Sequence, residues 1–452
     1  MFDELIEMLE QKNYTELKKQ LSKMEPADIV IFFEILDRED AVRVFRILPK
    51  ELAADSFAIM DHDMQEDLIE SFSASELQEI LDEMYLDDTV DVIEEMPASI
   101  VKRIISHLDA DTRKIVNKML RYPEDSAGSI MTTEYVTLKP FFSVEDALMR
   151  IRRTGLDKET IYTCYVTNAT NVLIGVVTVK DILLSNDDAL IGDIMDKDLI
   201  YVETEEDQEK VAKMFDKYDF LAIPVVDRER RLVGIITVDD AMDVIQEENT
   251  EDFEKMAAIL PSEDSYFKTS IFKHARNRIL WLIILMISGT FTGMIIEKYE
   301  NAFQLFPLLV SFVPMLMDTG GNSGSQTSTL MIRGIALDFI KPKDIFKVWL
   351  REIRIAMLVG FTLAAVNTVR MFILYYSSHP VGEIVKYALL LGITIFLVVC
   401  FAKTLGCSLP LLAKACKLDP ALMASPLITT ITDAATVLIY FSLAVKILNI
   451  PM

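Results

Sequence analysis

The chain has 452 residues, 51% of them hydrophobic, and a net charge of −25. That charge is uneven: residues 1–270 carry 61 acidic and 29 basic side chains, whereas 16 basic and 9 acidic side chains follow from Lys273 onward. A part with a net charge of −32 repels nucleic acid and attracts cations. The four cysteines form no CxxC pair and do not indicate a disulfide framework. The acidic start lacks the basic and apolar regions of a signal peptide, so we expect the soluble part to stay in the cytoplasm.

The first 125 residues repeat a short helical pattern. Similar segments start at Pro26, Lys50, Ala74 and Pro97, at offsets of 24, 24 and 23 residues. Each continues with apolar residues at spacings of three and four, which is typical of short helices that stack on their neighbours. We therefore predict a small α-solenoid N domain over residues 1–125, which alone would suggest a binding or regulatory surface.

A different repeat follows over residues 126–248. The segments Ile174–Ile182 and Val233–Ala241 share the order apolar-Gly-apolar-apolar-Thr-Val-x-Asp and lie 59 residues apart. Short β-like runs alternate with helices around them, which predicts two α/β modules at about 126–186 and 187–248. These residues resemble a pair of CBS modules. The resemblance implies that Asp181 and Asp240 match positions that contact the ribose of a bound adenine nucleotide; the alternative is that both only cap helices.

The remainder reads as a connecting segment and a membrane domain. An acidic connecting helix and linker are predicted over 249–275, and a transmembrane domain of five helices over 276–452. The five candidate spans are Ile279–Ile296, Ala302 to about Ile332, Ile355–Ser378, Tyr387–Ala402 and Ala421–Val445. Basic loops alternate with loops poor in Lys and Arg, so we expect a cytoplasmic N-terminus and an extracytoplasmic C-terminus.

Asp433 is the one charged residue of the fifth candidate span and lies twelve residues from each end of it. A carboxylate at that depth costs on the order of 3 kcal/mol to insert. Such an acid usually faces a bundle interior or a water path, which makes a functional site the leading hypothesis. The alternatives are a structural carboxylate paired with a neighbour such as Arg370, or a protonated acid inside the bundle.

A second unusual stretch runs from Gly320 to Ser328 and consists of small and polar residues within a candidate span. Exposed backbone and hydroxyl groups occur inside a membrane where protein or water covers them. A helix-packing face of small residues is the alternative interpretation. The fifth span offers a matching set of hydroxyls at Thr429, Thr430 and Thr432, beside Asp433.

The motifs in Pro314–Gln326 and Asp419–Asp433 resemble those of the MgtE-type magnesium channel and transporter family, and the resemblance covers the whole chain. It implies a homodimer whose pore is lined by the second and fifth spans, with Asp433 holding a largely hydrated Mg²⁺. Mg²⁺ dehydrates reluctantly and takes octahedral oxygen ligands, while few histidines and no thiol pairs argue against a soft-metal site. The pore-lining residues are then Gly321, Asn322, Gly324, Gln326, Thr429, Thr430 and Asp433.

The resemblance also assigns a role to the acidic cytoplasmic part. It implies that Mg²⁺ bound between the N domain, the CBS pair and the connecting helix holds the pore shut, and that the acids repel one another when cytosolic Mg²⁺ falls. The positions carried over are Asp91, Asp216, Asp227, Glu247, Glu248, Glu251 and Asp252. The alternative for each one is an ordinary solvated surface acid.

The expected function is therefore Mg²⁺ uptake through a channel or transporter of the cytoplasmic membrane. The expected partners are the lipid bilayer, Mg²⁺ and a second copy of the chain, and ATP is a possible ligand of the CBS pair. Transport of Mn²⁺ or Co²⁺, and a Mg²⁺ sensor or scaffold without transport, remain alternatives. An enzyme is not expected, because the four histidines are scattered and no GxSxG, HExxH or Walker motif is present.

Overall fold

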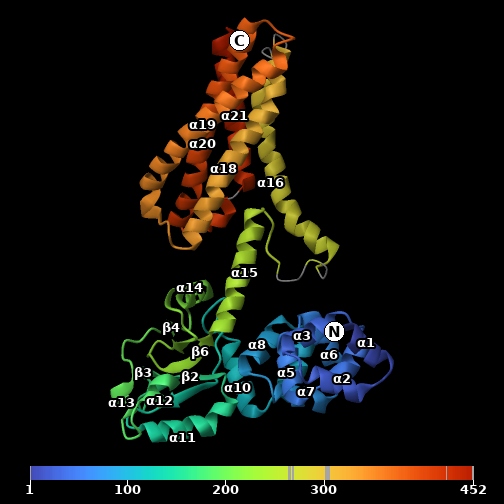
Figure 1. The fold of residues 1–452 in the computed structure, drawn as a ribbon, viewed down its shortest axis with the longest axis vertical. Coiled ribbons are helices and arrows are strands. Elements are labelled where there is room, and N and C mark those ends of the chain that lie inside the picture. The colour runs from blue at the N-terminus through green and yellow to red at the C-terminus, as the bar shows by residue number, and fades with distance from the viewer. Residues whose placement is uncertain (1, 263–265, 267–268, 301–305, 424, 450–452) are drawn as a thin grey trace. The chain divides into compact units, whose positions relative to one another are not determined.

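The computed structural model describes residues 2–262, 266, 269–300, 306–423 and 425–449 (Figure 1). The chain divides into two units, Met1–Gln246 and Glu247–Met452. Parts of the predicted linker, at 263–265 and 267–268, and the start of the second predicted span, at 301–305, lie outside the described residues. The predicted class, a multidomain protein with a helical N domain, α/β CBS modules and a helical membrane domain, is confirmed.

The N domain is a stack of short helices. They are α1 (Phe2–Glu10), α2 (Tyr14–Leu21), α3 (Pro26–Glu34), α4 (Arg38–Phe45), α5 (Lys50–Ala58), α6 (His62–Ser71), α7 (Ala74–Leu81), α8 (Leu86–Glu95), α9 (Ala98–His107) and α10 (Ala110–Met119). The four predicted repeats correspond to α3, α5, α7 and α9, and each of these helices packs against the next. Leu17, Phe32 and Phe57 are fully buried in the shared core. The repeat therefore folds as the α-solenoid that its periodicity predicts.

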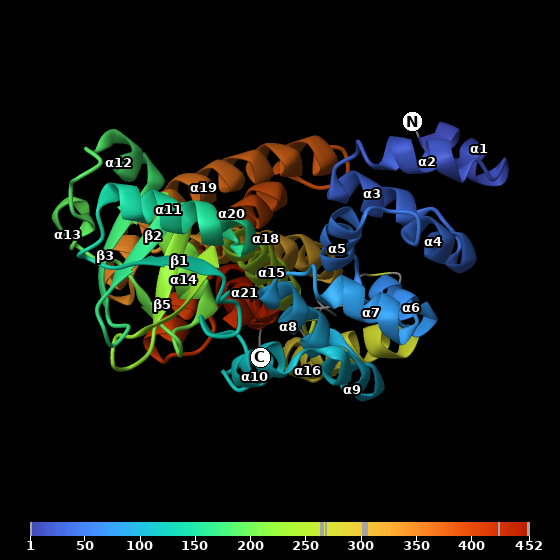
Figure 2. The same ribbon diagram turned by 90° about the horizontal axis from the view of Figure 1, so that it is seen from below.

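Two small sheets follow the N domain. The first module contains β1 (Tyr135–Leu138), α11 (Val144–Thr154), β2 (Thr160–Thr167), β3 (Leu173–Thr178), α12 (Val179–Leu184) and α13 (Ile191–Ile194). The second contains β4 (Val202–Glu203), α14 (Gln208–Tyr218), β5 (Ala222–Val226) and β6 (Leu232–Thr237). In each sheet the first two strands are parallel and the third is antiparallel. Figure 2 shows α11 and α12 beside the strands of the first module.

The two modules share one interior. Isolated bridges pair Thr132 with Ile235 and Val172 with Arg231. A common apolar cluster includes Tyr165 and Leu173 from the first sheet and Leu232 and Ile235 from the second. The tandem modules are therefore packed as one body, because each supplies part of the core that covers the other.

The membrane unit is a helical bundle. Its helices are α16 (Ile271–Glu297), α18 (Val313–Ala336), α19 (Ile345–Tyr375), α20 (Val381–Ala415) and α21 (Ser425–Leu448), with 3₁₀ turns η2 (Pro307–Phe312), η3 (Pro342–Asp344) and η4 (Pro420–Met423). Among the described residues, four segments are long and apolar enough to cross a membrane: those of α16, α19, α20 and α21. The 24-residue α18 is about 36 Å long, but its polar patch lowers its hydropathy. It packs against α20 and α21 within the bundle.

The helices of the bundle extend beyond the predicted apolar spans. Helix α19 begins at Ile345 instead of Ile355, and α20 ends at Ala415 instead of Ala402. The last helix begins only at Ser425, so Asp433 lies in its first half and not at its centre. Helix α15 (Val238–Met256) starts directly after β6 and runs unbroken past residue 248, where the sequence places the start of the connecting segment.

Candidate functional site

A polar stripe runs along one face of α18. Asp318, Asn322 and Gln326 follow one another at steps of four residues, and all three are exposed. The Nδ2 atom of Asn322 donates a hydrogen bond of 2.9 Å to Oδ1 of Asp318. Since four residues make about one helical turn, the stripe is a column of oxygen and amide groups on an exposed face of α18, in a bundle of otherwise apolar helices.

Helix α21 brings Asp433 to this stripe. Asp433 is half-buried, and its carboxylate interacts electrostatically with that of Asp318 on α18. The hydroxyl of Thr430 donates to the carbonyl of Pro426 at 2.9 Å, and that of Thr429 donates to the same carbonyl at 2.9 Å. Both threonines precede Asp433 by about one helical turn, and a hydroxyl that donates a hydrogen bond can still accept one. Carboxylate, amide and hydroxyl oxygens are the ligands that suit a hydrated Mg²⁺.

The glycines of α18 lie on its packed side. A Cβ atom on Gly321 would approach Cγ2 of Thr429 to 2.9 Å, and a Cβ on Gly324 would approach Cγ2 of Ile428 to 2.7 Å. Both glycines are buried, and so is Thr432. They let α18 and α21 approach closely, as the packing alternative requires. Their contribution to a pore lining stays a prediction.

Arg370 is not the partner of Asp433. Its Nη2 atom donates to Oδ1 of Asn367 at 2.9 Å on the same helix, α19. Among the described residues, no ion pair joins Arg370 to Asp433. The alternative of an Asp433–Arg370 salt bridge therefore finds no support.

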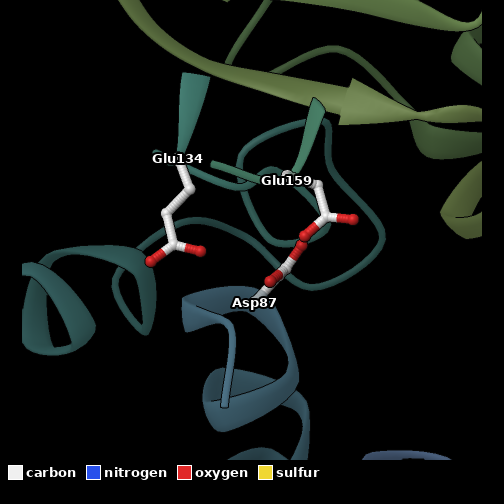
Figure 3. A group of neighbouring side chains, drawn as sticks. All are labelled: Asp87, Glu134 and Glu159. Atoms are coloured by element: carbon white, nitrogen blue, oxygen red, sulfur yellow. The ribbon is translucent and has the colours of Figure 1, made fainter. Parts of the chain in front are cut away.

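A second cluster of acids lies in the other unit, where the N domain meets the CBS pair (Figure 3). Asp87 is the second residue of α8, Glu134 directly precedes β1, and Glu159 directly precedes β2. One carboxylate oxygen from each of the three lies within 4.8 Å of the others. The N–H of Glu159 donates to the carbonyl of Glu134 at 3.0 Å, which fixes the two glutamates side by side. Three convergent carboxylates from separate elements are a donor set that fits a hard divalent cation.

Crowding makes these carboxylates hard to ionise. Burial, and then the charge of Asp88, raise the pKa of Asp87 to about 7. Burial and the charge of Asp87 raise the pKa of Glu159 to about 8. Oδ1 of Asp87 and Oε2 of Glu159 are buried without a hydrogen-bond partner among the described residues. A cation placed between them would supply the missing partner and remove the repulsion.

The predicted sensor residue Asp91 belongs to the same cluster. It lies one turn after Asp87 on α8, and although its side chain has exposed surface, loss of hydration and the charges of Asp87 and Asp240 raise its pKa to about 8. Burial and the charge of Asp87 also raise the pKa of Asp240 to about 7. Asp240 additionally accepts hydrogen bonds from the N–H and the hydroxyl of Thr237, and Asp181 is in the same position relative to Thr178. Both therefore do cap helices, while their contact with a nucleotide stays a prediction.

The other predicted sensor acids lie elsewhere. Asp216 is exposed on α14. Asp227 lies in the turn between β5 and β6; burial would raise its pKa, but hydrogen bonds from Arg231 and Glu229 outweigh burial and lower it. Glu247, Glu248, Glu251 and Asp252 lie on the part of α15 that belongs to the membrane unit. Their regulatory role stays a prediction.

Several site residues were missed in the sequence. No local pattern in the sequence marks Glu134 or Glu159. Asp87 could have been found, because Asp87, Asp91 and Glu94 place like charges on one face of a single helix. Asp318 could also have been found, one turn before Asn322.

Comparison with known proteins identifies the family of the chain. The chain matches the MgtE divalent cation transporter family over residues 313–443, the MgtE intracellular N domain over 24–125, and CBS domains over 127–186 and 191–247. It is 37% identical over 343 residues to the magnesium transporter MgtE of Thermus thermophilus, covering 76% of this chain and 74% of that protein. It is 34% identical over 345 residues to the magnesium transporter MgtE of Bacillus subtilis, with the same two coverages.

Solved structures resemble about half of the chain. The crystal structure of the cytosolic domain of the Mg²⁺ channel MgtE in complex with ATP matches with a TM-score of 0.52 and 36% identity, covering 54% of this chain and all of that one. The soluble part of a magnesium transporter matches with a TM-score of 0.52 and 32% identity, covering 55% of this chain and 97% of that one. The family matches extend from the N domain through the CBS pair into the membrane helices, so this chain belongs to the MgtE family of divalent cation transporters.

Proposed function

We propose that this protein carries Mg²⁺ across the cytoplasmic membrane along the polar stripe of α18 and past Asp433 on α21, and that cytosolic Mg²⁺ closes this path by binding to the acidic cytoplasmic residues. The observation that carries the proposal is that the carboxylate of Asp433 lies near enough to the Asp318–Asn322 column for the two carboxylates to repel each other, on helices of an otherwise apolar bundle. Relatives that match most of the chain are named magnesium transporters, which supports Mg²⁺ as the ion and transport as the activity.

The exposed stripe points to a second subunit. Asp318, Asn322 and Gln326 are exposed in one chain, and such groups need water or protein around them inside a membrane. A homodimer that brings two stripes and two Asp433 carboxylates around a shared axis would enclose a wet path. A hydrated Mg²⁺ would then be held by carboxylate charge and by hydrogen bonds from its waters to amide and hydroxyl oxygens, without full dehydration.

Regulation would use the acidic cluster of Asp87, Asp91, Glu134 and Glu159. With cytosolic Mg²⁺ present, a bound ion offsets the repulsion among these carboxylates and keeps the N domain against the CBS pair. With Mg²⁺ depleted, the carboxylates repel one another and the contact weakens. The acids Glu247, Glu248, Glu251 and Asp252 on α15 would pass this change toward the membrane helices, with Asp216 and Asp227 as further ligands from the second module.

The basic loops between the membrane helices support a cytoplasmic N-terminus and an extracytoplasmic C-terminus. An adenine nucleotide at the CBS pair is supported by the similar cytosolic domain that was solved with ATP. Calorimetry of the full chain with ATP, alongside Asp181→Ala and Asp240→Ala variants, tests this binding. Absence of heat for the unaltered chain would contradict it.

The central test is divalent flux into liposomes that contain the purified protein. We expect Mg²⁺ entry that falls as Mg²⁺ on the cytoplasmic side rises, and parallel assays with Mn²⁺ and Co²⁺ determine the ion preference. A reconstituted protein that binds Mg²⁺ but carries none would favour the sensor or scaffold alternative. A rate of Mg²⁺ entry that does not change with Mg²⁺ on the cytoplasmic side would contradict the regulatory part of the proposal but not the transport part.

A further inference from the structure

A buried charged network lies behind the polar stripe of α18. Glu352 on α19 and Lys403 on α20 are each 6% exposed, and Thr327 on α18 is 1% exposed. Nζ of Lys403 donates to the hydroxyl of Thr327 at 3.0 Å, and that hydroxyl donates to Oε2 of Glu352 at 3.1 Å. Nζ of Lys403 also lies 3.7 Å from the same carboxylate oxygen. One threonine hydroxyl thus connects a cation and an anion from two other helices.

This network sits at a close crossing of α18 and α20. A Cβ on Gly406 of α20 would come within 3.2 Å of both the carbonyl carbon of Gly324 and Cβ of Thr327, and Gly406 is buried. A Cβ on Gly324 would lie 3.3 Å from the carbonyl oxygen of Ala402. With the backbones this close, α18 has little room to move toward α20, which leaves rotation about its own axis as a movement that side-chain contacts must restrain. Thr327 restrains that rotation because it accepts a hydrogen bond from Lys403 and donates one to Glu352.

Stability alone does not account for buried charges here. Replacing a buried ion pair with well-packed apolar residues is often neutral or stabilising, whereas removing one partner is costly. Unlike apolar packing, the pair fixes the orientation of the groups it joins, because hydrogen bonds between charged and polar groups require a defined geometry. Thr327 lies nine residues after Asp318, which is about half a turn around the helix. Thr327 is only about 100° around the helix from Gln326, so the network holds α18 on its buried side and opposite the Asp318 end of the stripe.

We infer that Glu352, Lys403 and Thr327 are positioning residues that set the rotation of α18, and through it the aim of Asp318, Asn322 and Gln326 toward the conducted ion. This inference rests on the proposed transport function. Its consequence is that ion preference depends on residues that do not touch the ion. Helix α18 is also held on a second side, toward the start of α21. The hydroxyls of Ser325 and Ser425 lie 2.8 Å apart, and the hydroxyl of Ser328 donates to the carbonyl of Met423 at 3.0 Å.

The sharpest test is Thr327→Val, which keeps the shape of the side chain and removes its hydroxyl, with Thr327→Ser as the matched control that keeps the hydroxyl. In proteoliposome uptake assays without internal Mg²⁺ we expect Thr327→Val to raise the half-saturating Mg²⁺ concentration and to lower the Mg²⁺ over Ca²⁺ flux ratio, each about five- to tenfold. Thr327→Ser should stay within about twofold of the unaltered protein. A loss of folded protein lowers the maximal rate but moves neither of these two quantities.

A charge exchange gives an independent test if Thr327→Val folds poorly. Glu352→Lys alone places two cations around Thr327 and should shift the flux ratio, whereas Glu352→Lys combined with Lys403→Glu restores a cation and an anion on either side of the hydroxyl and should return the ratio toward that of the unaltered protein. Unchanged half-saturation and flux ratio in Thr327→Val, or no rescue by the exchange, would overturn the inference. Absence of Mg²⁺ flux in the unaltered protein would instead overturn the proposed function.

Discussion

The ammonium group of Lys255 near the end of α15 lies 2.8 Å from the carboxylate of Asp419, just before η4, and 2.7 Å from that of Glu251 one turn earlier on α15. The neighbouring Met256 packs against Ile332 on α18 and Ala421 in η4. Burial would lower the pKa of Lys255, but its hydrogen bonds to Asp419 and Glu251 raise it. The ion pair therefore persists across the physiological pH range, and the end of α15 is tied to the last turns of α18 and to the segment that leads into α21.

We expect Lys255→Met to loosen this attachment and to weaken inhibition by cytoplasmic Mg²⁺, because the end of α15 would no longer be held at the membrane helices. The pair is partly exposed, so the shift in half-inhibiting Mg²⁺ should be modest, about threefold. Proteoliposome flux at graded internal Mg²⁺ measures it. Lys255→Arg keeps the charge and serves as the control; equal inhibition in Lys255→Met and the unaltered protein would show that this attachment has no part in regulation.

The acidic cluster predicts a pH dependence of stability. The carboxylates of Asp87, Asp91 and Glu159 have folded-state pKa values of about 7 to 8, far above their ordinary values. The folded protein therefore binds more protons than the unfolded chain, so metal-free stability should fall as pH rises from about 4 through about 8 and level off above that range. Because Mg²⁺ binds the ionised carboxylates, its stabilising effect should be larger at about pH 8 than at about pH 6.

Thermal unfolding of the detergent-solubilised full chain, with chelator or with saturating Mg²⁺, measures both effects. The double variant Asp87→Asn with Glu159→Gln should melt at a higher temperature than the unaltered protein at about pH 8 without metal, and should gain less from Mg²⁺. Asp219→Asn changes an exposed acid just after α14, whose backbone φ of 55° asparagine tolerates, and should leave both measurements unchanged. The same pH slope in the double variant and the unaltered protein would contradict the assignment.

Asp433→Asn should reduce Mg²⁺ flux to the background of protein-free liposomes, because it removes the carboxylate charge at the narrow polar face while preserving size and hydrogen-bonding capacity. Asp338→Asn is the matched control, since Asp338 is an exposed acid just beyond the end of α18 and its backbone has a φ of 56°, which asparagine tolerates. Size-exclusion profiles of the two variants should agree with that of the unaltered protein. Undiminished flux in Asp433→Asn would remove this residue from the ion path.

The close crossing of α18 and α20 predicts an unequal response to one type of substitution. Gly406→Ala would place a methyl group against the backbone of Gly324 and should destabilise the membrane unit by about 1–3 kcal/mol. Gly293→Ala on α16 meets no atom within 4 Å and should be neutral or slightly stabilising. Thermal unfolding in detergent compares the two. Equal melting temperatures would show that the crossing is looser than these contacts indicate.

The parts of the fold that could be predicted are those with a strong local signal. The N-domain helices follow from apolar spacing at three and four residues, and β3 and β6 start 59 residues apart, as the repeated Gly-x-x-Thr segments indicate. Asp433 stands out because a charge inside an apolar segment is conspicuous. In each of these cases the neighbours in sequence determine the outcome, so one sequence is enough.

The rest depends on contacts between distant residues. Asp87, Glu134 and Glu159 come together because α8 packs near the strand starts of the first CBS module, and nothing local marks the two glutamates. Glu352 and Lys403 fall just outside the predicted apolar spans, because a charged residue lowers hydropathy and so marks the end of a predicted span. In the folded bundle each of the two charges neutralises the other, and both helices continue past these residues. The glycines of α18 could be assigned to packing only once their neighbours Thr429 and Ile428 were known.

Helix α16 buries little of its surface within its own chain. Thr292 is its buried residue, and the helix packs against α21, the last helix. The ring of Tyr299, just after α16, stacks on Phe441 at 5.2 Å, and its hydroxyl lies 3.3 Å from that of Ser442. During biosynthesis α16 leaves the ribosome before α18, α19 and α20, and long before the surface that receives it. The first membrane helix therefore stays unpacked against α21 until translation is almost finished. Assembly of this half of the molecule is completed only after its final helix has been made.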